Sequence, residues 1–122
     1  YGFTEEQALR MSASFGGGIG RMRETCGAAC GMFILAGLEK GSVVAGDHAG
    51  KAANYALVQE LAAEFRKRNG SLICAELLGL KPQTPVVSTP EERTQQYYAK
   101  RPCVKMVEEA ACIWAEYLEK VK

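Results

Sequence analysis

Residues 15–38 read FGGGIGRMRETCGAACGMFILAGL. Four glycines occupy five consecutive positions, 16–20, and glycine loses the most backbone entropy when it is fixed in a helix. The following segment, 32–38, is apolar apart from one glycine. These residues therefore predict a glycine loop that leads into a buried helix beginning near Arg23 or Glu24.

Cys26 falls in the first turn of this expected helix. Unpaired backbone N–H groups and the positive end of the helix dipole favour an anion there. Arg21 and Arg23 precede the cysteine, and Glu24 opposes them locally. The sum of these influences predicts that the thiolate of Cys26 is favoured over its thiol.

The composition describes an ordinary globular domain. The 122 residues are 48% hydrophobic and 24% charged, which suits one domain with one core over residues 1–122. The net charge of +1 argues against a nucleic-acid partner, and no apolar stretch is long enough to cross a bilayer. We therefore expect neither nucleic acid nor membrane as a partner.

Five cysteines make an odd number for a disulfide framework. They are Cys26, Cys30, Cys74, Cys103 and Cys112. This count favours a reducing, cytoplasmic setting in which the thiols serve redox or metal chemistry.

Helical signals cover the rest of the chain. Thr4 and Gln7 have capping-box spacing, Asp47 can cap a long helix, and Gly41 suits a left-handed C-cap. The expected helices are 5–14, 24–40, 48–68, 72–78, 90–99 and 103–120, with an irregular loop over 80–89. No segment alternates convincingly as a strand, so we predict an all-α small bundle of about three main helices plus short ones.

Periodicity predicts which helix faces are buried. The expected core positions are Ala8, Leu9 and Met11 in the first helix, then Ala49, Ala53, Leu57, Leu61 and Phe65, and finally Val104, Val107, Ala111, Trp114, Leu118 and Val121.

Three cysteines share a position that favours reactivity. Cys26, Cys74 and Cys103 each lie at or near the start of an expected helix, so they could converge on one redox or metal centre, or the coincidence could be accidental. Cys30 lies one turn after Cys26. It could add a metal ligand if others came from elsewhere, but a small buried apolar residue is the commoner role.

The glycine loop also suggests an anion site. It lacks the Lys-Ser/Thr pair of a Walker A loop and the βαβ context of a dinucleotide fingerprint. A generic anion nest using Gly18, Gly20 and Arg21 would make them cofactor-binding residues. The commoner alternative is a tight turn that permits close backbone approach.

Three blocks of the sequence resemble one known family. Residues 15–31, residues 69–79 (NGSLICAELLG) and the segment CVKMV from Cys103 resemble the redox-active family named C_GCAxxG_C_C for its cysteine pattern. The resemblance implies a small, helical, redox-active protein with no established substrate, related to a domain of the split-Soret cytochrome, which carries haem and an iron–sulfur centre. By position, Cys26, Cys74 and Cys103 match the family's cysteines.

The sequence departs from the family pattern in two places. Family members usually carry an earlier cysteine in an Asn-Cys-type segment, which does not occur in this sequence. Either the chain lacks an N-terminal Cys-containing segment, or one ligand or redox partner is missing, and a four-cysteine cluster is then not expected unless Cys30 or Cys112 substitutes. Ala28 follows Cys26-Gly27, so the literal name motif is not reproduced. No haem-attachment motif of the C-x-x-C-His type is present.

The leading hypothesis is a thiol-based redox or electron-transfer protein with an unknown redox partner. Cys26 would be the reactive thiolate, with Cys74 and Cys103 as resolving thiols. Three thiolates plus one outside ligand could also hold zinc or an iron–sulfur cluster. The alternative is a non-enzymatic helical assembly module with inert cysteines, whose Ala- and Gly-rich faces form a homodimer.

Overall fold

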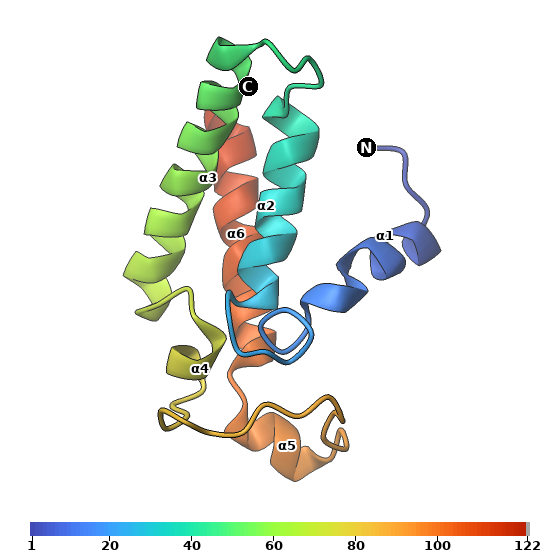
Figure 1. The fold of residues 1–122 in the computed structure, drawn as a ribbon, viewed down its shortest axis with the longest axis vertical. Helices are drawn as coiled ribbons and strands as arrows, with labels where there is room; N and C mark the ends of the chain where they lie inside the picture. Colours follow the sequence, from blue (N-terminus) through green and yellow to red (C-terminus); the bar gives the residue numbers. More distant parts are fainter. Residues whose placement is uncertain (122) are drawn as a thin grey trace.

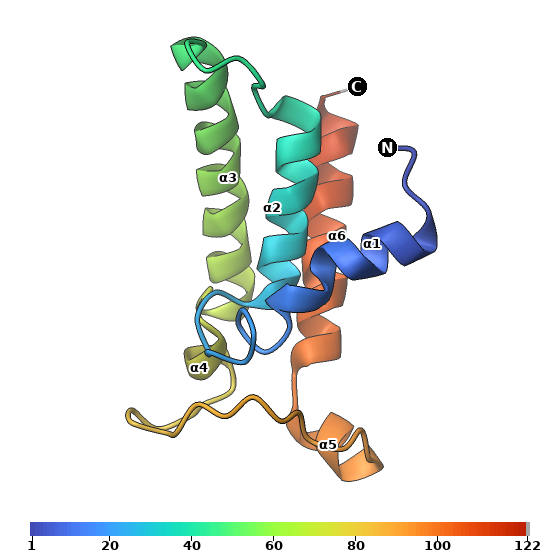
Figure 2. The ribbon, with the colours of Figure 1, turned by 45° about the vertical axis from the view of Figure 1, so that its right-hand side comes forward.

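Three long helices lie side by side in the computed structural model, which describes residues 1–121 and, of residues 98–100, the backbone only (Figures 1 and 2). They are α2 (Gly27–Lys40), α3 (His48–Asn69) and α6 (Cys103–Lys120). Residues 1–121 contain no strand, only one isolated bridge between Thr25 and Ile73. The predicted all-α bundle with three main helices is therefore confirmed.

The hydrophobic core lies between α2, α3 and α6. Its members are Ala29, Met32, Ala36, Leu57, Leu61, Phe65, Met106, Ala110, Ile113 and Trp114. The stripe predicted for α3 is confirmed at Leu57, Leu61 and Phe65 but is wrong at Ala49 and Ala53, which are exposed. The α6 prediction holds for Trp114 but is wrong for Ala111, which is exposed, and for Val104, Val107 and Val121, which are more than half exposed. Two apolar stripes run along α6, and the one with Met106, Ala110 and Ile113 faces the core.

The first helix, α1 (Glu5–Ser12), continues into a 3₁₀ turn, η1 (Ala13–Phe15). Its capping box is present: the amide of Gln7 donates to Thr4 Oγ1 at 3.1 Å, and the amide of Thr4 donates to Gln7 Oε1 at 2.9 Å. However, α1 has no buried residue, and Leu9 is 63% exposed. The predicted core face of α1 is wrong because the helix extends away from the three long helices toward the N-terminus (Figure 1).

Two boundaries of α2 differ from the prediction. Ile19, Arg21 and Arg23 have left-handed φ values of 65°, 60° and 62°, which a right-handed helix excludes, so α2 begins only at Gly27. At the other end Gly41 is extended, with φ −63° and ψ 136°, and is not the expected left-handed cap.

Asp47 caps α3 as predicted. Its carboxylate accepts from the amide of Gly50 at 2.8 Å and from the hydroxyl of Ser42 at 2.9 Å. These hydrogen bonds, that of Gly50 first, lower the pKa of Asp47. The helix ends at Gly70, whose φ of 93° is left-handed.

Two short helices follow, at the same end of the bundle as the glycine loop (Figure 1). They are α4 (Cys74–Leu77) and α5 (Gln95–Lys100). The predicted start of α5 at Pro90 is wrong because Thr94 is the N-cap, accepting from the amide of Tyr97 at 3.1 Å. The irregular loop over 80–89 is confirmed.

Candidate functional site: a groove lined by three thiols

A single antiparallel bridge brings Cys26 and Cys74 to the same face of the backbone. The amide of Cys26 donates to Leu72 O at 2.7 Å, and the amide of Cys74 donates to Glu24 O at 2.6 Å. Both cysteines flank the bridging pair, so their side chains leave on the side opposite to Thr25 and Ile73. Both thiols line the same groove, and negative charge on Cys74 acts on the thiol of Cys26.

The glycine loop packs directly against Cys74. Gly18 has a φ of +74°, and a Cβ built on it would lie 2.5 Å from Cys74 Cβ and 2.8 Å from Arg23 Cα. Likewise a Cβ on Gly27 would lie 2.5 Å from Phe15 O. The close-approach interpretation of these glycines is therefore confirmed.

The backbone of the loop is occupied by its own hydrogen bonds. The amide of Gly20 donates to Ser14 O at 2.7 Å, and that of Arg21 donates to Gly16 O at 3.1 Å. These two amides are already hydrogen-bonded, which argues against an anion nest that uses the amides of Gly20 and Arg21. The cofactor-binding role of Gly18, Gly20 and Arg21 stays a prediction. All three residues nevertheless line the groove described below.

The two arginines of the loop have different partners. Arg21 Nη1 donates to the carbonyl oxygens of Val87, at 3.0 Å, and Thr89. Arg23 Nη1 instead lies 3.7 Å from Cys74 Sγ. Arg21 was expected to supply positive potential to a thiol, but the arginine that contacts one is Arg23.

The predicted preference of Cys26 for the thiolate is wrong. Burial raises the pKa of its thiol, and negative charge on Cys74 or Cys103 raises it further. The amides of Ala28 and Ala29 oppose this and lower the pKa, but burial is the largest influence. Cys26 is the N-cap residue of α2 and packs, partly buried, against the hydrophobic core, and its position in the sequence does not indicate this desolvation.

One groove collects the three cysteines that sequence reasoning singled out. It has a volume of about 1140 Å³, and Cys26, Cys74 and Cys103 all line it. Cys26 is partly exposed, Cys74 is buried and Cys103 is exposed. The remaining walls come from α1, α2, α6, the glycine loop and the segment that precedes α6. The three cysteines expected to converge on one centre therefore line one groove, and their convergence on a single redox or metal centre stays a prediction.

The other two cysteines lie apart from this groove's lining. Cys30 is buried, with its Sγ 3.9 Å from Thr25 O, as expected for a small core residue. Burial, then charge on Cys26, raises the pKa of Cys30. Cys112 is exposed on α6.

The donor atoms do not form a closed metal site. Within residues 1–121, no three His, Cys, Asp or Glu side chains are grouped so that they could hold a metal ion. Cys26, Cys74, Cys103 and Cys30 therefore share a region of the molecule without the arrangement that zinc or an iron–sulfur cluster requires.

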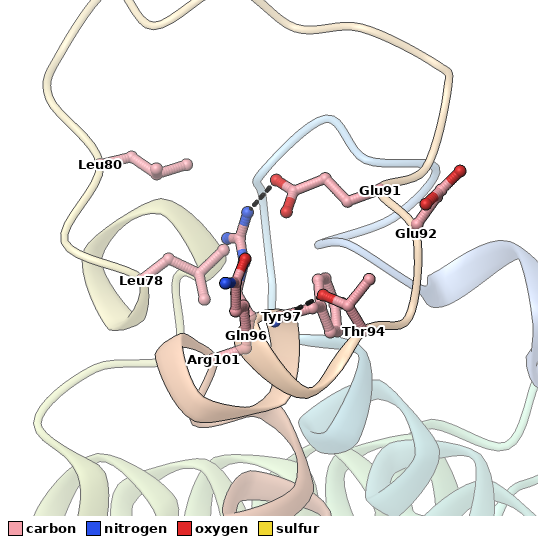
Figure 3. A pocket seen from close by; sticks show the side chains of 8 residues that line it. All are labelled: Leu78, Leu80, Glu91, Glu92, Thr94, Gln96, Tyr97 and Arg101. Atoms are coloured by element: carbon pink, nitrogen blue, oxygen red, sulfur yellow. Dashed lines mark hydrogen bonds and ion pairs between the residues drawn. The ribbon is translucent and has the colours of Figure 1, made fainter.

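A smaller pocket of about 450 Å³ adjoins the groove (Figure 3). Arg101, which pairs with Glu91, lines both cavities, as does Tyr97. The guanidinium of Arg93 lies 4.5 Å from the centre of the Tyr97 ring, and that of Arg101 lies 5.7 Å from it. Sequence reasoning missed these residues because 80–101 shows no periodic pattern that would place them beside the thiols.

Fold and site together define a small all-α protein with a thiol-lined groove. The model of the family described as "Putative redox-active protein (C_GCAxxG_C_C)" matches residues 1–117, and the chain belongs to this family. The chain shows no significant similarity to a curated protein or to a solved structure. None of the helices described is both long and apolar enough to cross a membrane.

Proposed function

We propose that the protein is a thiol–disulfide redox protein in which Cys26 and Cys74 form the reacting pair. The observation that carries this proposal is the Thr25–Ile73 bridge, which presents both thiols on one face at a groove large enough for a partner segment. The redox-active description of the family agrees with it.

The reaction is an exchange with a disulfide of a partner, R–S–S–R′. The thiolate of Cys26, the more exposed of the pair, attacks one sulfur; the S–S bond breaks, and R′S⁻ leaves and takes up a proton. Cys74 then attacks Cys26 Sγ and displaces RS⁻, which is also protonated. The protein loses two electrons and two protons and gains a Cys26–Cys74 disulfide, while the partner's disulfide becomes two thiols.

Neighbouring residues support this chemistry in different ways. Arg23 places a guanidinium against Cys74 Sγ, where it compensates negative charge on the sulfur. Both cysteines are free thiols in the structure, and their Cβ atoms must lie about 3.8 Å apart when the disulfide closes. The single turn of α4 is the element that moves, because it is only four residues long.

Metal binding is the second form of the proposal. Zinc or an iron–sulfur cluster held by Cys26, Cys74 and Cys103 would need these thiols to draw together around it and one further ligand from outside the chain. Anaerobic purification followed by metal analysis and a visible spectrum tests this form. A colourless, metal-free protein would exclude it without affecting the dithiol form.

The dithiol form is tested by controlled oxidation. After treatment with glutathione disulfide, peptide mass spectrometry should find a Cys26–Cys74 disulfide in the wild type, and none in Cys26→Ser or Cys74→Ser. Cys112→Ser is the matched control, because this thiol is exposed and lies outside the groove lining. If the wild type forms no Cys26–Cys74 bond and the cysteine variants lose only packing-sized stability, the cysteines are inert, as the assembly-module alternative states.

A further inference from the structure

Arginine side chains gather at the thiol end of the groove. The charged side chains that line the groove are Arg21, Arg23, Glu91, Arg93 and Arg101. All five belong to the glycine loop or to the segment before α6, which lie at the same end of the bundle (Figure 1). Four positive charges against one negative charge give this end a balance of +3, whereas the whole chain carries a net charge of +1. Positive charge is therefore concentrated where the thiols lie.

Two of the four arginines have a counter-charge within the site. The guanidinium of Arg101 pairs with the carboxylate of Glu91 (Figure 3). Arg23 Nη1 lies 3.7 Å from Cys74 Sγ and compensates the charge that forms on this sulfur during exchange. These contacts leave two guanidinium groups without an anionic partner among residues 1–121.

The two remaining arginines, Arg21 and Arg93, are held in place by uncharged groups. Arg21 donates to the carbonyl oxygens of Val87 and Thr89. Arg93 donates to the hydroxyl of Tyr97, and its guanidinium lies 4.5 Å from the centre of that ring. Carbonyl and phenol groups orient a guanidinium but do not neutralise it, and arginine has five N–H donors in all. Both side chains are therefore positioned to bind an anion that this chain does not supply.

The rest of the groove is apolar and suits a peptide segment. Phe3, Met11, Leu38 and Val107 line it and are exposed. The lining residues of α1, α2 and α6 carry no charge. The volume of about 1140 Å³ exceeds the range of about 300–1,000 Å³ that is usual for small-molecule sites. A small anionic disulfide would leave the apolar part empty, whereas the side chains of a protein segment can fill it.

We infer that the partner is a protein whose reactive disulfide lies in an acidic segment, with carboxylates beside the attacked cysteine against Arg21 and Arg93. Apolar residues further along this segment occupy the uncharged part of the groove. The inference rests on the dithiol function proposed above and names the class of partner for that reaction. Opposite charges raise the rate of encounter with such a partner and suppress encounters with basic ones.

Two peptides that differ only in charge test the inference. Each contains one cysteine in a disulfide with mercaptoethanol and the same apolar tail, and the cysteine is flanked by aspartates in one peptide and by lysines in the other. Exchange with the reduced protein is followed by mass spectrometry, and each rate is divided by the rate with dithiothreitol, an uncharged dithiol. At about 0.01 M salt the acidic peptide should react at least about tenfold faster. The ratio should approach one at about 1 M salt, where the screening length is only about 3 Å.

Substitution of Arg93 connects this ratio to the groove. Arg93→Gln should lower the ratio of acidic to basic rates about two- to five-fold, the size expected for one exposed ion pair. Arg93→Lys keeps the charge and should retain most of the ratio. Arg66→Gln is the matched control, because Arg66 is exposed on α3 and does not line the groove, and it should keep the full wild-type ratio.

A binding measurement separates this inference from the dithiol function. The same peptides with serine in place of cysteine cannot react, and fluorescence anisotropy gives their Kd values. Tighter binding of the acidic peptide without exchange of either disulfide retains the acidic partner and removes the dithiol function. Equal exchange rates, or a ratio that Arg93→Gln leaves unchanged, overturn the acidic partner and leave the dithiol function standing. Absence of both exchange and a difference in Kd overturns both.

Discussion

Substitution of Gly18 by alanine measures how tightly the glycine loop is pressed against the thiol site. At φ +74° an alanine costs about 1–2 kcal/mol from backbone strain alone. Its methyl group would lie 2.5 Å from Cys74 Cβ and 2.8 Å from Arg23 Cα. Forcing these apart costs about 1–3 kcal/mol, so Gly18→Ala should lose about 2–5 kcal/mol in total.

The chain offers a matched control for this substitution. Gly20 is also left-handed, at φ +57°, but a Cβ there would meet nothing within 4 Å, so Gly20→Ala should lose only about 1–2 kcal/mol. Urea unfolding followed by the fluorescence of Trp114, the single tryptophan, compares the two. Equal losses of unfolding free energy in the two variants would refute the close packing of Gly18 on Cys74.

Three further predictions follow from burial and charge. The amide of Gly50 lowers the pKa of Asp47, so this carboxylate stabilises the folded state fully above the ordinary aspartate pKa. The stabilisation is lost as the pH falls through the lower pKa that Asp47 has in the folded protein. The difference in urea midpoint between the wild type and Asp47→Asn should therefore disappear below about pH 4. Because burial raises the pKa of Cys26, its alkylation rate, followed by mass spectrometry, should rise with pH through a midpoint above that of free cysteine; a midpoint below it contradicts the described environment. Ile113→Ala should lower the free energy of unfolding, measured with urea, by about 2–5 kcal/mol, because Ile113 is buried. Val104→Ala should lower it by at most about 0.5 kcal/mol, because Val104 is exposed. The reverse order would contradict the observed orientation of α6.

The helices were predictable because their signals are local. The caps at Thr4 and Asp47 depend only on neighbouring residues, and the structure confirms both. The rotation of α6 was not predictable, because its valine stripe and its Met106 stripe are both apolar. Only packing against α2 and α3 selects between them.

The site was predictable in its cysteines but not in their environment. Position near helix starts singled out Cys26, Cys74 and Cys103, and all three line one groove. The pKa of Cys26 depends on burial by distant segments, and the choice of Arg23 over Arg21 depends on left-handed backbone angles in the loop. The spacing of residues along the chain indicates neither the burial of Cys26 nor the contact of Arg23 with Cys74.

The bridge between Thr25 and Ile73 links sulfur chemistry to backbone dynamics. It is an isolated rung, and its two hydrogen bonds are donated by the amides of the cysteines themselves. Any rearrangement that brings the sulfurs of Cys26 and Cys74 together must therefore strain or break the hydrogen bonds of this bridge. Deuterium uptake at these two amides would therefore act as a built-in gauge of the oxidation state of the protein.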